Sequence, residues 1–187
     1  MEMTNVLTIK TRSALRAWLS EYGEIKKECW VATSVKEQAG LLRYLDVVDE
    51  ALCFGWIDST KKKVDGQVFQ RLSPRGRRSR WTELNKERVR RLRKLGLMTA
   101  EGEAVLPEME VAAFVIDPII EKRLKSEQLY QTFLTFPPLY QRIRIDTIQY
   151  YRNDLDLFEK RLTKLVEQTR ANNMYGTWHD EGRLIDY

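Results

Sequence analysis

Residues 56–72, WIDSTKKKVDGQVFQRL, predict a β-hairpin that decides the fold of the first half of this chain. One predicted strand covers residues 56–64, and in a second one Val68, Gln70 and Leu72 alternate with Phe69 and Arg71. Between them stands Asp65-Gly66, a pair typical of the tight two-residue turn in which both central residues need a positive φ. The chain therefore contains at least one antiparallel strand pair.

The segments before the hairpin predict a helix, a strand and a second helix. Residues 11–22 place apolar side chains on one helical stripe, and Gly23 is a stop signal. Residues 29–35 are rich in β-branched side chains and predict a short strand. Asp46 is the expected N-cap of a helix that continues through Cys53.

The chain after the hairpin is predicted to be helical except for a polar loop and the C-terminal tail. Residues 74–80 carry no apolar side chain apart from Pro74, so we expect a solvated loop there. The first predicted helix after the hairpin covers residues 85–95 and turns Val89, Leu92 and Leu95 inward. A second begins at Asp117-Pro118, and an apolar stripe follows at Leu129, Phe133 and Leu134. Two more helices are predicted, one over residues 139–151 and a last one capped by Asp154. Residues 174–187 are expected to pack without regular structure. The fold class is therefore α+β: a small antiparallel or mixed sheet with helices over residues 1–110, followed by a helical layer over residues 111–187.

Composition places the chain among globular proteins. Hydrophobic residues make up 43% and charged residues 32% of the 187 residues, which is too apolar for a disordered chain. No apolar run approaches the roughly 18–20 residues that a membrane-spanning helix needs. The first residues lack a basic region followed by an apolar stretch, so we expect no signal peptide. With only Cys29 and Cys53, a disulfide framework is not expected, and the predicted compartment is the cytoplasm.

Positive charge is concentrated in one segment, residues 61–94. This segment holds fourteen basic residues against three acids, a net charge of +11, whereas the whole chain carries +5 and the remainder therefore −6. Such asymmetry indicates an anionic partner. The residues predicted to contact it, a nucleic acid or another anion, are Lys61, Lys62, Lys63, Arg71, Arg75, Arg77, Arg78 and Arg80.

Aromatic side chains interleave with these cations. Trp56, Phe69 and Trp81 are positioned to stack on bases, which favours single strands or RNA over a duplex. The alternative is that these rings belong to the core and that the cations are merely solvated. Consecutive strand residues face opposite sides, so Lys61, Lys62 and Lys63 cannot all lie on one surface.

A small-anion pocket is a second prediction from the same region. Trp56 and Trp81 are expected to form an aromatic wall, with Asp58, Asn85 and Arg88 supplying polar groups for a carboxylate or phosphate. Asn85 and Arg88 are three residues apart, so on a helix they share a face.

Catalytic, metal and cofactor sites are not predicted. Cys53 is expected at the C-terminal end of its helix, where the helix dipole disfavours a thiolate, so we interpret it as a core cysteine. His179 is the only histidine, so a Cys–His dyad would require Cys53 and His179 to meet in the fold. The two cysteines lack the spacing of a zinc site, and no phosphate-binding glycine loop is present.

Several motifs together resemble the YdeI family of bacterial proteins. They are DEALCFGWID at residues 49–58, Ser73-Pro74-Arg75, Trp81-Thr82 with Asn85-x-x-Arg88, Gly96-Leu97-Met98-Thr99, and FPPLYQR at residues 136–142, which resembles the family's OmpD-associated, or bacteriocin-protection, domain. The resemblance implies a link to bacteriocin tolerance or stress. It brings no catalytic residues, and Leu139-Tyr140 stands where the family commonly has Ser-His after the two prolines.

The leading hypothesis is a non-enzymatic YdeI-like protein that engages an anionic partner through residues 61–94. One alternative is an enzyme of undefined class with a pocket built around Cys53, Trp56, Asp58, Trp81, Asn85 and Arg88. Another is an interaction scaffold that contacts a second protein through its C-terminal helices.

Overall fold

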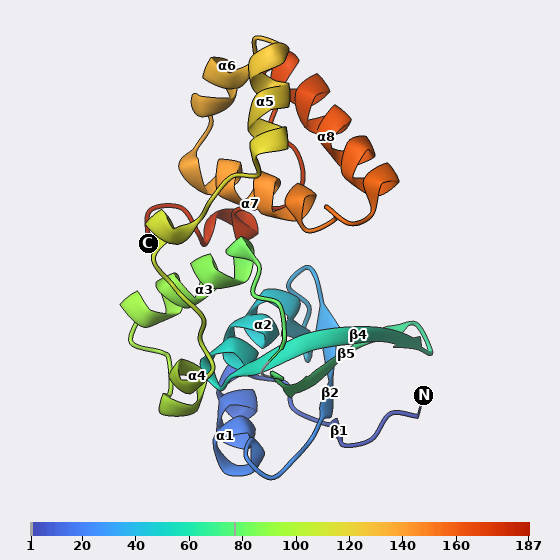
Figure 1. The fold of residues 1–187 in the computed structure, drawn as a ribbon. Helices are drawn as coiled ribbons and strands as arrows, with labels where there is room; N and C mark the ends of the chain where they lie inside the picture. The colour runs from blue at the N-terminus through green and yellow to red at the C-terminus, as the bar shows by residue number, and fades with distance from the viewer. Residues whose placement is uncertain (1, 77) are drawn as a thin grey trace. The chain divides into compact units, whose positions relative to one another are not determined.

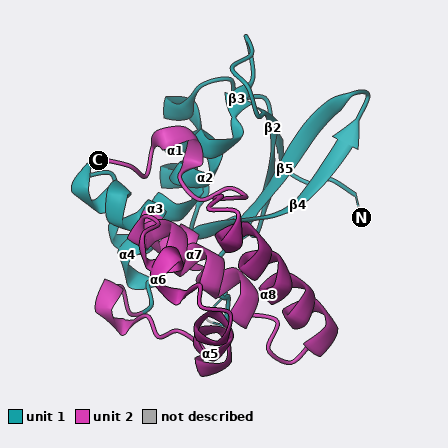
Figure 2. Cartoon of the chain, turned by 90° about the horizontal axis from the view of Figure 1, so that it is seen from above, with its two compact units in different colours: residues 1–80, 88–107 teal, residues 81–87, 108–187 magenta. Residues whose placement is uncertain are grey.

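The computed structural model describes residues 2–76 and 78–187, and the chain divides into two compact units (Figure 1, Figure 2). Unit 1 comprises residues 1–80 and 88–107, and unit 2 comprises residues 81–87 and 108–187. Unit 1 contains the sheet, and unit 2 is helical, which confirms the α+β class with helices in the C-terminal half. The main break after residue 107 lies close to the predicted boundary at residue 110, whereas residues 81–87 join the second unit.

The sheet of unit 1 is mixed. Its order is β1-β2-β5-β4, and β3 pairs with β2 as well. β1 and β3 run parallel to β2, whereas β5 runs antiparallel to both β2 and β4. The strands are β1 (Val6–Leu7), β2 (Cys29–Ser34), β3 (Leu42–Arg43), β4 (Trp56–Val64) and β5 (Gln67–Pro74).

The predicted β4–β5 hairpin is confirmed, including its turn. Asp65 and Gly66 have φ values of 48° and 82°, the positive values that a two-residue hairpin turn requires. Val64 pairs with Gln67 across this turn, and the register shifts between Asp58 and Lys61 in a β-bulge. In Figure 1 the turn end of the hairpin extends beyond the other strands of the sheet.

Helices pack on one face of this sheet because their apolar stripes match its apolar face. The core of unit 1 joins Leu15 and Leu19 of α1, Val47 and Ala51 of α2, and Cys29, Val31 and Leu72 of the strands. The helices are α1 (Arg12–Tyr22), α2 (Tyr44–Cys53), α3 (Glu83–Lys94), of which the residues from Arg88 onward belong to unit 1, and α4 (Ala100–Ala104).

Two predictions about the helices of unit 1 are wrong. Asp46 does not cap α2, because the helix begins at Tyr44 and Asp46 lies in its first turn. An acidic side chain in the first turn is still stabilised by the positive end of the helix dipole. Leu95 is 50% exposed rather than inward, since α3 ends one residue earlier; Val89 and Leu92 are buried as predicted.

Unit 2 is built from α5 (Pro118–Ser126), α6 (Tyr130–Leu134), α7 (Pro138–Gln149) and α8 (Leu155–Arg170). Both predicted caps are confirmed: the carboxylate of Asp117 accepts from the Ile119 amide at 2.8 Å, and that of Asp154 accepts from Leu157 at 3.1 Å. The buried core of unit 2 includes Ile120, Leu124, Phe133, Tyr140, Ile143, Ile148, Phe158, Leu162 and Leu165.

Two segments of unit 2, α6 and the C-terminal tail, differ from the predictions. Leu134 was predicted on the apolar stripe but is 44% exposed, because α6 is a single short turn that buries Phe133 instead. The tail contains a 3₁₀ turn at Asp180–Gly182, and it buries Trp178 and Leu184. Across the residues that the structure describes, no helix combines the length and apolarity needed to cross a membrane.

Candidate anion-binding hairpin

The three lysines of the hairpin divide between the two faces of the sheet. Lys61 pairs with Gln70, Lys62 with Phe69, and Lys63 with Val68. Because neighbouring strand residues alternate, Lys61 and Lys63 lie on one face and Lys62 on the other. The prediction that they cannot form a one-sided patch is therefore confirmed, although all three are exposed to solvent.

Lys61 is held in place by Tyr44, a residue that sequence analysis missed. The Lys61 ammonium lies 4.1 Å from the centroid of the Tyr44 ring, a cation–π contact. The Tyr44 hydroxyl donates to Asp58 Oδ2 at 2.6 Å, so Asp58 orients the ring rather than pairing directly with a lysine. No pattern near Tyr44 signals this role, because the contact depends on α2 packing beside β4.

A cavity of about 240 Å³ opens beside Lys61. Its lining combines hydroxyl and amide side chains with apolar ones: Thr33, Ser34, Gln38, Tyr44 and Gln67 are polar, and Val35, Leu41 and Val68 are apolar. Among the described residues of this lining, Lys61 is the single charged one and none is a carboxylate. A positive centre surrounded by neutral polar groups suits an anion.

Other cations of the segment are neutralised by acids. Arg71 lies in an ion pair with Glu28, at 2.7 Å from Nε and 2.5 Å from NH2 to Oε2. Hydrogen bonds from Thr4 and Arg71 lower the pKa of the Glu28 carboxyl, so this acid stays ionised. On α3, Arg91 pairs with Asp49 at 3.0 Å, and Arg93 pairs with Glu103.

Among its described residues, the loop after β5 carries one buried arginine and two exposed ones. Arg75 was expected in a solvated loop but is only 7% exposed, and its NH1 donates to the Arg80 carbonyl oxygen at 2.9 Å. Burial lowers the pKa of Arg75 to about 10, although the charge of Asp58 opposes this shift. Arg75 therefore organises the loop. Arg78 and Arg80 are exposed, and Arg77 lies outside the described residues.

The residues predicted to form a small-anion pocket belong to different units. In unit 1, Trp56 is 2% exposed, donates from Nε1 to the Gly23 carbonyl at 3.3 Å, and meets Trp18 edge to face. Arg88, also in unit 1, is 7% exposed. Trp81 and Asn85 belong to unit 2 and are half-buried. Trp56 is thus a core residue whose ring is not available for stacking on a base.

Cys53 lacks the properties of a nucleophile. It is fully buried at the C-terminal end of α2, and burial raises the pKa of its thiol to about 11. His179 belongs to unit 2, where its Nδ1 accepts a hydrogen bond from the Gly182 amide. Within residues 2–76 and 78–187, no group of three or more His, Cys, Asp or Glu side chains is arranged to hold a metal ion.

A larger cavity of about 640 Å³ lies along α1, but its charges are mixed. Its cation, Arg16, donates to Glu50 at 2.9 Å and to the Leu97 carbonyl at 2.6 Å. Glu24 and Glu101 also line it. An anion would find no unbalanced positive charge there, so the hairpin cavity is the better candidate in unit 1.

Comparison with known proteins found a match to one protein family. The domain of unknown function DUF8412 matches residues 7–105, which is more than half of the chain and includes the hairpin, α1, α2 and α3. No curated protein and no solved structure matched the sequence. Because the match covers most of the residues of unit 1 together with its sheet and candidate site, the chain belongs to the DUF8412 family.

Proposed function

We propose that this protein is a non-enzymatic binding protein that engages an anionic partner through the exposed cations of residues 61–94. The observation that carries the proposal is the hairpin itself: Lys61 is the one charged residue among the described residues that line a cavity, Lys63 is exposed on the same face of the sheet, and Lys62 is exposed on the opposite face. Single-stranded nucleic acid is the partner class to test first. The resemblance to the YdeI family, with its link to bacteriocin tolerance or stress, and a cytoplasmic location belong to the same proposal.

The structure favours contact with phosphates over stacking on bases. Trp56 is buried, and Phe69 is half-buried between neighbouring strands. Exposed cations of the hairpin and the following loop include Lys61, Lys62, Lys63 and Arg78. With four phosphate contacts, the logarithm of the binding constant should fall with the logarithm of salt concentration with a slope of about −3 for a single strand.

The test is a fluorescence titration of the whole protein with single-stranded RNA at several salt concentrations. Lys62→Gln/Lys63→Gln removes two contacts and should reduce the magnitude of the slope by about 1.4. The matched control, Lys26→Gln/Lys27→Gln, removes the same charge from exposed residues of unit 1 outside the segment and should leave the slope unchanged. Absence of binding at low salt, or equal losses in both variants, rejects the hairpin as the binding surface.

A further inference from the structure

Unit 2 contains a cavity with more positive charge than the hairpin cavity. It measures about 450 Å³ and is lined from α7, α8 and the segment after α8. Four of its lining residues are cations: Arg144, Lys160, Arg161 and Lys164. Acids are missing from this lining, whose residues all lie in the described part of the chain. Its size falls within the range of roughly 300–1,000 Å³ found for ligand sites.

Helical spacing brings these cations together. Lys160, Arg161 and Lys164 stand at positions i, i+1 and i+4 of α8, so they share one side of the helix. The opposite side is apolar and buried, with Phe158, Leu162 and Leu165 in the core. Burial of that side therefore turns the basic stripe toward the cavity. The spacing of these cations is visible in the sequence, whereas their position beside Arg144 depends on the fold.

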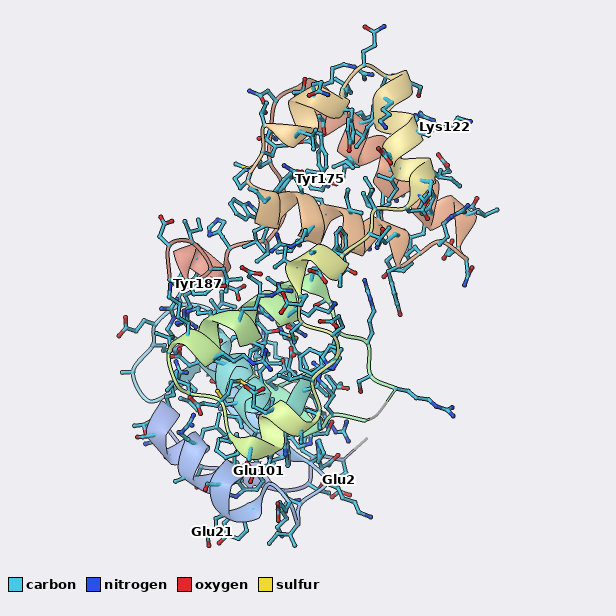
Figure 3. All side chains as sticks on the ribbon, turned by 60° about the vertical axis from the view of Figure 1, so that its left-hand side comes forward. Glu2, Glu21, Glu101, Lys122, Tyr175 and Tyr187 are labelled. Atoms are coloured by element: carbon cyan, nitrogen blue, oxygen red, sulfur yellow. The ribbon has the colours of Figure 1, made fainter. Side chains whose placement is uncertain are left out.

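Tyr175 links the two helices at the cavity wall, and Figure 3 marks its position in unit 2. Its ring centroid lies 5.2 Å from the Arg144 guanidinium carbon and 5.0 Å from the Lys164 ammonium. Burial raises the pKa of the Tyr175 phenol although Arg144 and Arg161 oppose the shift, so the wall is partly shielded from water. The ring thus holds two like charges close together.

The arginines are oriented by the protein itself. Arg144 donates from NH2 to the Thr177 carbonyl oxygen at 3.0 Å, and Arg161 donates from NH1 to the Thr147 carbonyl oxygen at 3.3 Å. Gly176 permits the close approach of the tail, because a Cβ there would lie 2.6 Å from Arg144 NH1 and the residue has a φ of +73°. A site whose donors are already held in place loses less entropy when a ligand binds.

Within the described part of the chain, the absence of counter-charges distinguishes these four cations from several other arginines of unit 2. Arg142 pairs with Glu87 at 3.0 Å, Arg152 with Asp117 at 3.2 Å, and Arg170 with Glu127 at 2.8 Å. Among the described residues, none of the four cavity cations has an acid within ion-pair distance. Their mutual repulsion is therefore left for a bound anion to relieve.

We propose that this cavity binds a small molecule bearing two linked phosphate groups, such as a nucleoside diphosphate or another diphosphate. Guanidinium groups match phosphate oxygens with paired donors, and lysines add positive charge. A phosphate group carries a charge of about −1.5 to −2 at neutral pH, so two of them balance four cations. This site goes beyond the proposed polymer-binding function and lies in the other unit.

Isothermal titration calorimetry of the whole protein with inorganic pyrophosphate, orthophosphate and ADP tests the site. We expect one equivalent of pyrophosphate or ADP to bind, and orthophosphate to bind at least about tenfold more weakly. Lys160→Gln/Lys164→Gln should weaken pyrophosphate binding at least about tenfold, since both side chains are exposed and the variant should fold normally. Lys160→Arg/Lys164→Arg should retain binding.

The matched control is Lys122→Gln/Lys125→Gln on α5, which removes the same charge outside the cavity (Figure 3). If Lys160→Gln/Lys164→Gln and Lys122→Gln/Lys125→Gln weaken pyrophosphate binding equally, the effect is one of net charge and the proposed site is overturned. Failure of pyrophosphate to bind at low salt, or equal affinity for orthophosphate, also overturns it. If Lys160→Gln/Lys164→Gln abolishes RNA binding and leaves pyrophosphate binding unchanged, the surface belongs to a polymer instead. The hairpin variant Lys62→Gln/Lys63→Gln should leave pyrophosphate binding intact, so the two proposals fail separately.

Discussion

The buried carboxylate of Glu50 organises the contact between α1 and α2. Glu50 is 1% exposed and accepts from Arg12 Nε at 2.6 Å and from Arg16 NH1 at 2.9 Å. The two arginines are four residues apart on α1, so they share the face that meets α2. Glu50→Gln keeps the size of this side chain and removes its charge.

The expected cost follows from how far the pair is shielded from solvent. Removing one partner of a fully buried ion pair costs about 3–5 kcal/mol because the remaining charge is left uncompensated. The side chains of Arg12 and Arg16 are 32% and 34% exposed, so water screens part of their charge. We therefore expect Glu50→Gln to lower the free energy of unfolding by about 2–3 kcal/mol.

An exposed ion pair in the same unit provides the comparison. Arg93 and Glu103 are 2.5 Å apart, with 41% and 38% of their side chains exposed. Exposed pairs contribute about 0.2–1 kcal/mol, so Glu103→Gln should cost less than about 1 kcal/mol. Urea unfolding followed by tryptophan fluorescence measures both variants, since Trp18, Trp30 and Trp56 lie in unit 1. Equal losses in the two variants would refute the reasoning that burial decides the cost.

Three further predictions concern packing, pH and capping. A Cβ at position 102 would lie 2.1 Å from the Cys53 carbonyl oxygen, so Gly102→Ala should cost about 2–3 kcal/mol in unfolding free energy; wild-type stability would contradict this contact. Burial raises the pKa of Cys29 to about 12 and of Cys53 to about 11, above the value of about 8.5 for an unfolded thiol. As the pH rises, the thiols of the unfolded state therefore lose their protons before those of the folded state, and the free energy of unfolding should fall between about pH 9 and 11. The fall should be steeper than in the control variant Cys29→Ala/Cys53→Ala. Parallel pH profiles of the two proteins would argue against the buried thiols as the cause. Asp154→Ala removes the N-cap of α8 and should lower the thermal midpoint by an amount equivalent to about 1 kcal/mol, measured by circular dichroism, whereas Asp156→Ala, which caps nothing, should cost less.

Local sequence signals determined the elements whose stability depends on neighbouring residues. Asp65-Gly66 predicted its turn because few residues tolerate two consecutive positive φ values. Asp117 and Asp154 predicted helix starts because a capping carboxylate reaches an amide only two or three residues away. The alternation of strand side chains likewise showed that the three hairpin lysines divide between two faces.

Tertiary structure alone decided which charges remain available for a partner. The acid that neutralises Arg71 is Glu28, 43 positions away, and the ring that holds Lys61 comes from Tyr44 on another element. The cavity of unit 2 adds Arg144 of α7 and Tyr175 of the tail to the three cations of α8, so no single window of sequence shows the whole site. A count of basic residues therefore identified residues 61–94, where several cations are paired with acids. The physical reason is that a charge is compensated by whatever lies within a few ångströms in space, and the sequence specifies that distance only through the complete fold.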